Sequence, residues 1–313
     1  MKRIYTPEGL ALRDELSARY FNSYDMLEKA IDDDALLEAR AVMCDGDHNL
    51  IVDMNGLRGL IPRSECAYNP DGTDVKDIAV ITRVGKSVCF KVFGFTTGKN
   101  GEPVALLSRR AAQKSCYLDF VSRLVPGDII DARVTHFENF GAFVDIGCGI
   151  ISLLSIDCMS VSRISHPSDR FELGQRIRVA VKCPAGIDGR LTLTHKELLG
   201  TWQENREVFS VGQTVMGIIR SIESYGIFVE LAPNLAGLAE LKQGVSVGSC
   251  AAVYIKSIIP SKMRIKLAIV DVGMKETKAV TGKYFVAGDH MDTWQYSPAE
   301  CERIIRTDFS RID

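Results

Sequence analysis

The chain has 313 residues, 46% of them hydrophobic and 25% charged, and its 38 basic and 40 acidic side chains leave a net charge of −2. This composition is typical of a soluble globular protein, and the length allows two or more domains with separate cores. No apolar run approaches the roughly 18–20 residues that a membrane-spanning helix needs, and the first residues lack the apolar core of a signal peptide. These features argue against a membrane protein and favour the cytoplasm.

Cysteine and histidine are dispersed along the chain. The nine cysteines and five histidines form no CxxC or CxxH pair, which is the spacing that structural zinc sites use. An odd number of scattered cysteines also gives no disulfide framework. We therefore expect buried thiols in a reducing compartment, with no metal and no cofactor.

The first expected elements are helices. Residues 7–38 contain two helical stretches, "PEGLALRDELSARYF" and "YDMLEKAIDDDALLEA". After a β-rich region, "RRAAQKSCYLDFVSRLV" at 109–125 has apolar residues at helical spacing. We interpret these helices as packing struts between β-rich units.

Residues 126–198 form the clearest β-rich unit. Its short apolar runs are separated by Gly, Pro, Asn and Asp, which is typical of strands joined by turns. A small closed barrel fits five such strands best, because closure removes exposed strand edges. The expected strands are roughly 128–137, 142–147, 151–155, 176–183 and 190–195.

This unit recurs later in the chain. When the chain is laid against itself so that Pro126 meets Val211, "PGDIIDARVTHFENFGAFVDIG" falls on "VGQTVMGIIRSIESYGIFVELA". Phe143 then meets Phe228. Self-similarity at a fixed spacing indicates a repeated structural unit.

A weaker copy precedes both units. It contains "LLEARAVMCDGDHNLIVDMNGLRGLIPRSE", and it has His48 and Ile51 where the later copies have paired aromatics. Asn49 replaces the glycine of the turn. We expect this copy to keep the fold and to serve packing.

The sequence therefore predicts a mainly β protein of three tandem five-stranded barrels with helical N-terminal and linker segments. The expected division is a helical segment at 1–35, a degenerate barrel at 36–110, a linker helix at 111–125, a barrel at 126–198, a linker at 199–210, a barrel with a short loop at 211–273 and a C-terminal extension at 274–313.

The motif "FGAFVDIG", with "LGQRIRVAVK" and "GRLTLTHK" after it, resembles the S1-type RNA-binding repeat of bacterial small-subunit ribosomal protein S1. The resemblance is strong over 126–198, good over 211–270 and loose over 36–110. It implies OB-fold barrels in which single-stranded RNA stacks on the two aromatics of the F-G-x-F motif. The implied stacking residues are Phe140, Phe143, Tyr225 and Phe228.

The third strand of each copy departs from the family pattern. Where the family has a histidine close to RNA, this chain has Pro62, Ser155 and Glu240. A carboxylate on the RNA path repels phosphate, so Glu240 is expected to weaken the third barrel. The second copy keeps both phenylalanines and a longer loop before its fourth strand, and it is expected to dominate binding.

Strand alternation separates core from surface positions. It places Phe143 on the same outer face as Asp145, the solvent side. Outward rings stack on bases and outward cations follow phosphates, which suits single-stranded RNA even in a slightly acidic chain. The candidate contacts besides the stacking residues are Arg133, Arg178, Lys182 and Arg190 in the second unit and Tyr254, Lys256, Arg264 and Lys266 in the third.

We therefore expect a non-catalytic protein that binds single-stranded RNA, either mRNA or loops of structured RNA, in translation or RNA metabolism. The ribosome is a candidate partner. An enzyme that uses the repeats as substrate handles is disfavoured, because no clustered carboxylates, nucleophile–base pair or phosphate loop is present. A protein-interaction scaffold whose barrels have largely lost RNA binding stays open as the alternative.

Overall fold

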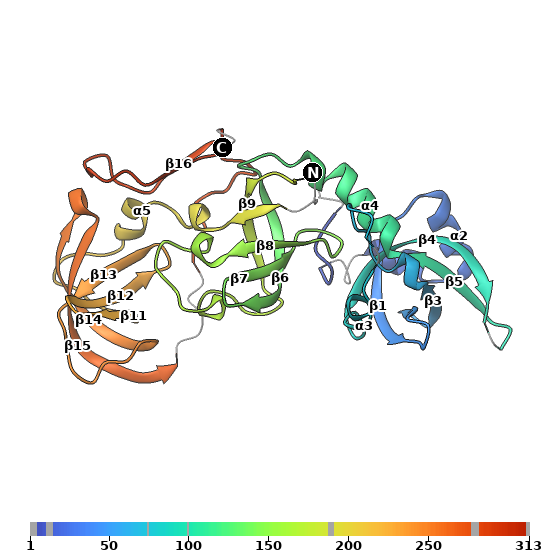
Figure 1. The fold of residues 1–313 in the computed structure, drawn as a ribbon, viewed down its shortest axis with the longest axis horizontal. Helices are drawn as coiled ribbons and strands as arrows, with labels where there is room; N and C mark the ends of the chain where they lie inside the picture. Colours follow the sequence, from blue (N-terminus) through green and yellow to red (C-terminus); the bar gives the residue numbers. More distant parts are fainter. Residues whose placement is uncertain are drawn as a thin grey trace.

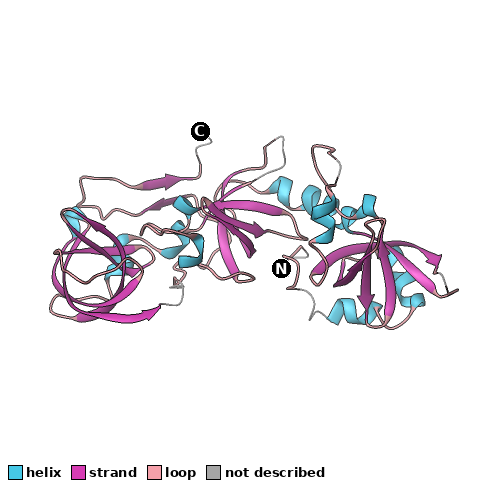
Figure 2. Ribbon diagram, turned by 60° about the horizontal axis from the view of Figure 1, so that its bottom comes forward, coloured by secondary structure: helices cyan, strands magenta, loops and turns pink. Residues whose placement is uncertain are grey.

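A computed structural model describes residues 5–10, 15–73, 75–98, 100–186, 191–276 and 282–310. Within these ranges the chain forms three closed barrels of five strands each. The barrels lie in an extended row (Figure 1), and helices lie around the first barrel and at the junctions (Figure 2). The predicted fold class of three tandem five-stranded barrels is confirmed.

Barrel 1 has the strand order β1-β2-β3-β5-β4. Alternating aliphatic residues of these strands fill its interior, and the N-terminal helices pack against its outside. Its elements are α1 (Glu15–Tyr20), α2 (Tyr24–Asp32), β1 (Leu37–Cys44), β2 (Leu50–Met54), β3 (Leu57–Ile61), α3 (Asp77–Ile81), β4 (Ser87–Thr97) and β5 (Pro103–Ser108).

Barrel 2 has the order β10-β8-β7-β6-β9 and follows helix α4 (Arg109–Asp119), which begins the region expected to be a linker helix. The N-cap Ser108 accepts a hydrogen bond from the Ala111 amide, which fixes the start of this helix. The observed strands agree with the predicted ones to within three residues at each end. They are β6 (Ile129–Glu138), β7 (Gly141–Asp145), β8 (Ile151–Ser155), β9 (Arg176–Cys183) and β10 (Thr192–Thr194).

Barrel 3 has the order β11-β12-β13-β15-β14. Helix α5 (Trp202–Arg206) precedes it, and the Trp202 side chain is buried in the core of this barrel. The last strand extends to Glu276. The strands are β11 (Thr214–Glu223), β12 (Gly226–Ala232), β13 (Leu235–Ala239), β14 (Ser249–Ile259) and β15 (Arg264–Glu276).

The glycine of the F-G-x-F motif is required by close backbone packing. A Cβ on Gly141 would lie 2.5 Å from the carbonyl oxygen of Leu154, and one on Gly226 would lie 2.7 Å from that of Ala239. Only glycine allows the second and third strands to approach this closely. The turn therefore holds the flanking aromatic side chains at fixed positions.

The C-terminal segment, for which the sequence offered no motif, returns along barrels 2 and 3. It contains β16 (Thr293–Gln295) and β17 (Arg306–Asp308), which lie beside these barrels in Figure 1. Trp294 and Tyr296 join the core cluster of barrel 3. Phe309 packs with Ile129 of barrel 2. The segment therefore fastens the two barrels to each other.

Asp145 does not face solvent, and the expectation that it would is wrong. Its side chain is 2% exposed and accepts hydrogen bonds from the amides of Glu8 (2.7 Å), Gly147 (2.8 Å) and Gly149 (3.0 Å). The Glu8 side chain in turn pairs with Arg109 at the start of α4. Burial and the nearby Glu8 carboxylate raise the pKa of Asp145 to about 7.

The error has a physical reason. Alternation shows that Asp145 points away from its own barrel, but it does not show what packs against that outer face. Here the N-terminal segment and helix α4 cover it, so the carboxylate belongs to the junction between barrels 1 and 2.

Candidate nucleic-acid interface

On the outer surface of each barrel, four residues from four neighbouring strands lie side by side, and we call this set the outer row. It contains the residue at the second aromatic position of the motif, on the second strand, and the residues paired with it in sequence across the sheet. In barrel 2 the row is His136, Phe143, Leu153 and Thr192. In barrel 3 it is Ser221, Phe228, Leu238 and Lys266. In barrel 1 it is Met43, Ile51, Leu60 and Leu106.

The two phenylalanines of barrel 2 form an edge-to-face pair. The ring centroids of Phe140 and Phe143 are 6.1 Å apart at an interplanar angle of 86°. Phe140 is 55% exposed and Phe143 is half-buried, whereas the next residue, Val144, is completely buried in the barrel. Both rings therefore present surface that a base can cover.

Barrel 3 repeats this arrangement with a tyrosine. The centroids of Tyr225 and Phe228 are 6.1 Å apart at 90°, and Tyr225 is 68% exposed. The two barrels thus hold aromatic pairs of the same geometry, which the buried glycines Gly141 and Gly226 keep in place.

His136 completes the row of barrel 2, and the sequence reasoning missed it. Strict alternation after Val134 would turn His136 into the barrel, but a β-bulge between these two residues leaves it exposed. Its imidazole lies nearly parallel to the Phe143 ring, with centroids 6.3 Å apart and an interplanar angle of 24°. A bulge in the first strand is not visible in the hydrophobic pattern.

Two of the predicted cations in barrel 2 are held by the terminal segments. Arg133 donates to the carbonyl oxygens of Glu8 (2.7 Å) and Gly174 (3.2 Å). Arg178 donates to the carbonyl oxygens of Val286 and Gly288. Both arginines lie towards the end of the barrel away from the row, because Arg133 is opposite Asp145 whereas Phe143 is opposite His136.

Of the other two predicted cations of barrel 2, the structure describes one. Lys182 is exposed, and its Nζ lies 4.0 Å from the Cys158 sulfur. Arg190 lies outside the described residues.

The cations of barrel 3 surround its row. Lys266 is in the row itself, and Arg264 and Lys256 are exposed beside it. The Lys256 ammonium lies 2.8 Å from the Glu240 carboxylate and lowers the pKa of Glu240. Glu240 therefore has a cationic partner that compensates its charge.

Tyr254 lies on β14 two residues before Lys256, and it pairs with Ala268 of β15. It is 40% exposed and pairs with Thr214 at the beginning of β11, whereas Phe228 pairs with Ser221 near the end of that strand.

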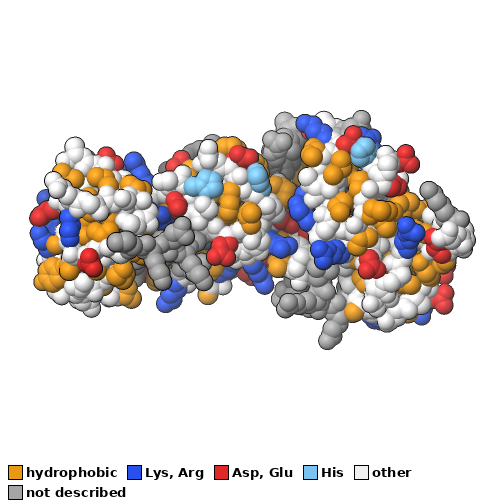
Figure 3. Space-filling view, turned by 90° about the horizontal axis from the view of Figure 1, so that it is seen from below, with side chains coloured by type: hydrophobic (Ala, Val, Ile, Leu, Met, Phe, Trp, Pro, Cys, Tyr) orange, Lys and Arg blue, Asp and Glu red, His pale blue; other side chains and the backbone are white. Residues whose placement is uncertain are grey.

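The outer row of barrel 1 is entirely apolar. Met43 is 46% exposed, and Phe93, which lies on β4 beside Leu106, is 49% exposed. Figure 3 shows hydrophobic side chains gathered on this barrel, at the right of the view, while Lys and Arg are dispersed over the same face of the molecule. His48, the other substituted motif position, has a left-handed φ of 60° in the turn between β1 and β2.

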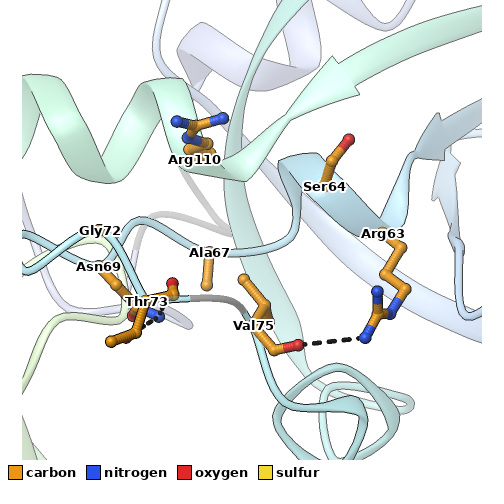
Figure 4. A pocket seen from close by; sticks show the side chains of 8 residues that line it. All are labelled: Arg63, Ser64, Ala67, Asn69, Gly72, Thr73, Val75 and Arg110. Atoms are coloured by element: carbon orange, nitrogen blue, oxygen red, sulfur yellow. Dashed lines mark hydrogen bonds between the residues drawn. The ribbon is translucent and has the colours of Figure 1, made fainter.

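A cavity of about 210 Å³ lies on barrel 1 next to the residues that follow β3 and β5 (Figure 4). Arg63 and Arg110 line it together with the turn around Gly72. The Arg63 guanidinium is already bound to the Asp77 carboxylate and the Val75 carbonyl. These lining residues include no nucleophile paired with a base.

Among the residues that the structure describes, no three His, Cys, Asp or Glu side chains come together as metal ligands. Across the same described part of the chain, every helix is too short or too polar to span a membrane.

Comparison with protein families finds a match to the S1 RNA binding domain over residues 124–183. The small ribosomal subunit protein bS1 homolog of Bacillus subtilis is 31% identical over 236 residues, which are 73% of this chain and 58% of that protein. The bS1 protein of Rhizobium meliloti is 26% identical over 88% of this chain and 49% of its own length. The chain thus spans about half the length of the relatives that it matches.

Among solved structures, a multidomain protein with nucleic acid binding domains from Streptococcus pneumoniae is 13% identical and covers 76% of this chain and 73% of its own. The TM-score of 0.26 is too low to relate the two arrangements of domains.

Proposed function

Because this chain carries an S1 RNA binding domain and is homologous to bacterial ribosomal protein bS1 over about 70% of its length, we propose that it is a non-catalytic RNA-binding protein. It binds single-stranded RNA, in mRNA or in loops of structured RNA, and acts in translation. The small ribosomal subunit is its candidate partner, and the cytoplasm its place of action.

The observation that carries this proposal is the aromatic pair that recurs in barrels 2 and 3. Phe140 and Phe143 repeat the geometry of Tyr225 and Phe228 at the same register of the barrel. Aromatic rings left partly exposed contribute little to folding, whereas a base that stacks on one gains about 1–3 kcal/mol. Stacking explains why both barrels keep rings at this position.

The proposed RNA contacts are the two aromatic pairs and the cations near them. Lys182, Lys256, Arg264 and Lys266 are exposed and available to phosphates. We retain Arg190 as a proposed contact, since "GRLTLTHK" places it just before β10. Arg133 and Arg178 bind carbonyl oxygens of the terminal segments. Tyr254, which is exposed two residues before Lys256, stays a proposed contact.

Titration of a labelled single-stranded RNA at several salt concentrations tests this function. Phosphate neutralisation by basic side chains gives an affinity that falls with salt, with a log–log slope of about 0.7 per phosphate for single strands. The same RNA incubated with the protein and with divalent metal stays intact if the protein is non-catalytic. Absence of salt-dependent binding would contradict RNA binding, and cleavage that disappears with a point variant would contradict the non-catalytic role.

The apolar outer row of barrel 1 favours a second function for that barrel alone, contact with a protein. The row has no cation and no aromatic ring. Met43 is exposed at its β1 end, and Phe93 is exposed beside Leu106 at its β5 end. Co-sedimentation with purified small ribosomal subunits tests this assignment. The double variant Met43→Glu/Phe93→Glu should weaken co-sedimentation while leaving affinity for free RNA unchanged; the reverse result would show that barrel 1 binds RNA.

A further inference from the structure

We propose that His136 is a third stacking residue of barrel 2, so that this barrel holds a longer stretch of RNA bases than barrel 3. The inference rests on the proposed RNA-binding function and assigns a residue outside the F-G-x-F motif to the interface.

The first step of the argument is the position of the imidazole. His136 is directly opposite Phe143 in the strand pairing, and the bulge after Val134 turns its side chain to the outer face. The two rings are nearly parallel at 24°, while Phe140 approaches Phe143 on edge at 86°. The three rings therefore form one continuous aromatic surface along the last residues of β6, the turn and the first residues of β7.

The second step is the freedom of this ring. The His136 side chain is 64% exposed, and its Nε2 lies 2.9 Å from the Glu138 carboxylate. Glu138 limits the rotation of the imidazole without covering its face. An ordered, exposed ring can stack on a base with a small loss of side-chain entropy.

The third step is the contrast with barrel 3. Ser221 occupies the position opposite Phe228, again next to a β-bulge after Ile219. The two barrels thus share the backbone geometry and the edge-to-face aromatic pair. They differ in the side chain beside that pair, which is an imidazole ring in barrel 2 and a hydroxymethyl group in barrel 3. Barrel 1 has Met43 at this position. The third ring belongs to barrel 2.

Exchange of these two side chains tests the inference. We would titrate fluorescein-labelled oligoadenylate of about 12 nucleotides, a length within the range that one OB-fold covers, against the full chain. His136→Ala should weaken binding by about fivefold or more. Ser221→His should tighten it by about threefold. The melting temperature should stay unchanged in both variants, since both residues lie on the outer face.

Three further variants separate the possible meanings of a loss. His136→Phe keeps an aromatic ring without polar atoms and should bind nearly as well as the original chain. His136→Gln keeps polarity without a ring and should resemble His136→Ala. His166→Ala is the matched control. It removes an imidazole from the same barrel, outside the outer row, and should leave RNA affinity unchanged.

Phe143→Ala distinguishes failure of this inference from failure of the proposed function. If Phe143→Ala loses affinity while His136→Ala and Ser221→His bind normally, His136 is not a stacking residue and the RNA-binding function stands. If neither Phe143→Ala nor His136→Ala changes affinity, the aromatic surface does not bind RNA and both proposals fail. Equal affinity losses for His136→Ala and His166→Ala would show that the effect is not specific to the outer row and would overturn the stacking role.

Discussion

Arg170 of barrel 2 donates a hydrogen bond to Glu230 of barrel 3 across 2.7 Å, with the two side chains 0% and 1% exposed. Arg220 also binds this carboxylate from β11. Glu230 stands at the repeat position of Asp145, which is buried at the other junction. Each junction therefore uses the acidic residue two positions after the second aromatic of the motif, Asp145 after Phe143 and Glu230 after Phe228, to hold a neighbouring part of the chain.

Removal of the Glu230 carboxylate should destabilise the protein strongly. Glu230→Ala leaves the guanidinium groups of Arg170 and Arg220 buried without their main counter-charge, and loss of one partner of a buried ion pair costs about 3–5 kcal/mol. Chemical denaturation of the full chain measures this loss as a lower free energy of unfolding of barrels 2 and 3.

The exposed ion pair between Arg176 and Asp131 gives the control. The Arg176 side chain is 62% exposed, so Arg176→Gln should change the free energy of unfolding by less than about 1 kcal/mol. Similar effects of Glu230→Ala and Arg176→Gln would mean that the junction contributes little to stability.

Phe143 and its neighbour Val144 should separate RNA binding from stability. Phe143→Ala removes a partly exposed ring, so RNA affinity should fall by about 1–3 kcal/mol with little change in melting temperature. Val144→Ala removes two buried carbon atoms, at about 0.8 kcal/mol each, and should lower the free energy of unfolding by about 2 kcal/mol while RNA affinity persists.

Melting curves and RNA titrations on these two variants are sufficient for the comparison. A Phe143→Ala variant that unfolds early and binds RNA normally would place the ring in the core. That result would contradict the assignment of the outer row.

Mild acid should destabilise barrel 2 through His195. The pKa of His195 is lowered to about 4, mainly by burial and also by the nearby charge of Arg170. The hydrogen bond to the Met159 carbonyl acts in the opposite direction and raises this pKa. The unfolded histidine takes up a proton below about pH 6.5 and the folded one only near pH 4. The contribution of His195 to the free energy of unfolding is therefore fully present above pH 6.5. It falls by up to about 3 kcal/mol as the pH decreases to 4.

Thermal unfolding between pH 7 and 4 measures this loss. His195→Gln removes the titrating group, so the part of the pH dependence that His195 contributes should be absent in the variant. Parallel pH curves for the two proteins would show that the buried imidazole does not control acid stability.

The hydrophobic pattern predicted which side chains of each strand point into the barrel. It gave little information about which other segments cover the outer face. It placed Val144 in the core and left Phe143 on the outer face, because these properties follow from the period of two along one strand. It failed for Asp145, because the segment that covers this side chain comes from the N-terminal end of the chain. It gave no sign that the C-terminal segment binds Arg178. It also missed His136, because a β-bulge changes the alternation without a sequence signal.

Lys182 and Lys266 should carry part of the salt dependence of RNA binding, and Arg178 should not. Each exposed lysine that neutralises a phosphate adds about 0.7 to the log–log slope of affinity against salt. Lys182→Gln and Lys266→Gln should therefore each make the slope shallower by about that amount. The Arg178 guanidinium is bound to Val286 and Gly288, so Arg178→Gln should lower the melting temperature and leave the slope unchanged. RNA titrations from low to moderate salt on the three variants provide the measurement, and a shallower slope for Arg178→Gln alone would move the RNA path to the surface that the C-terminal segment covers.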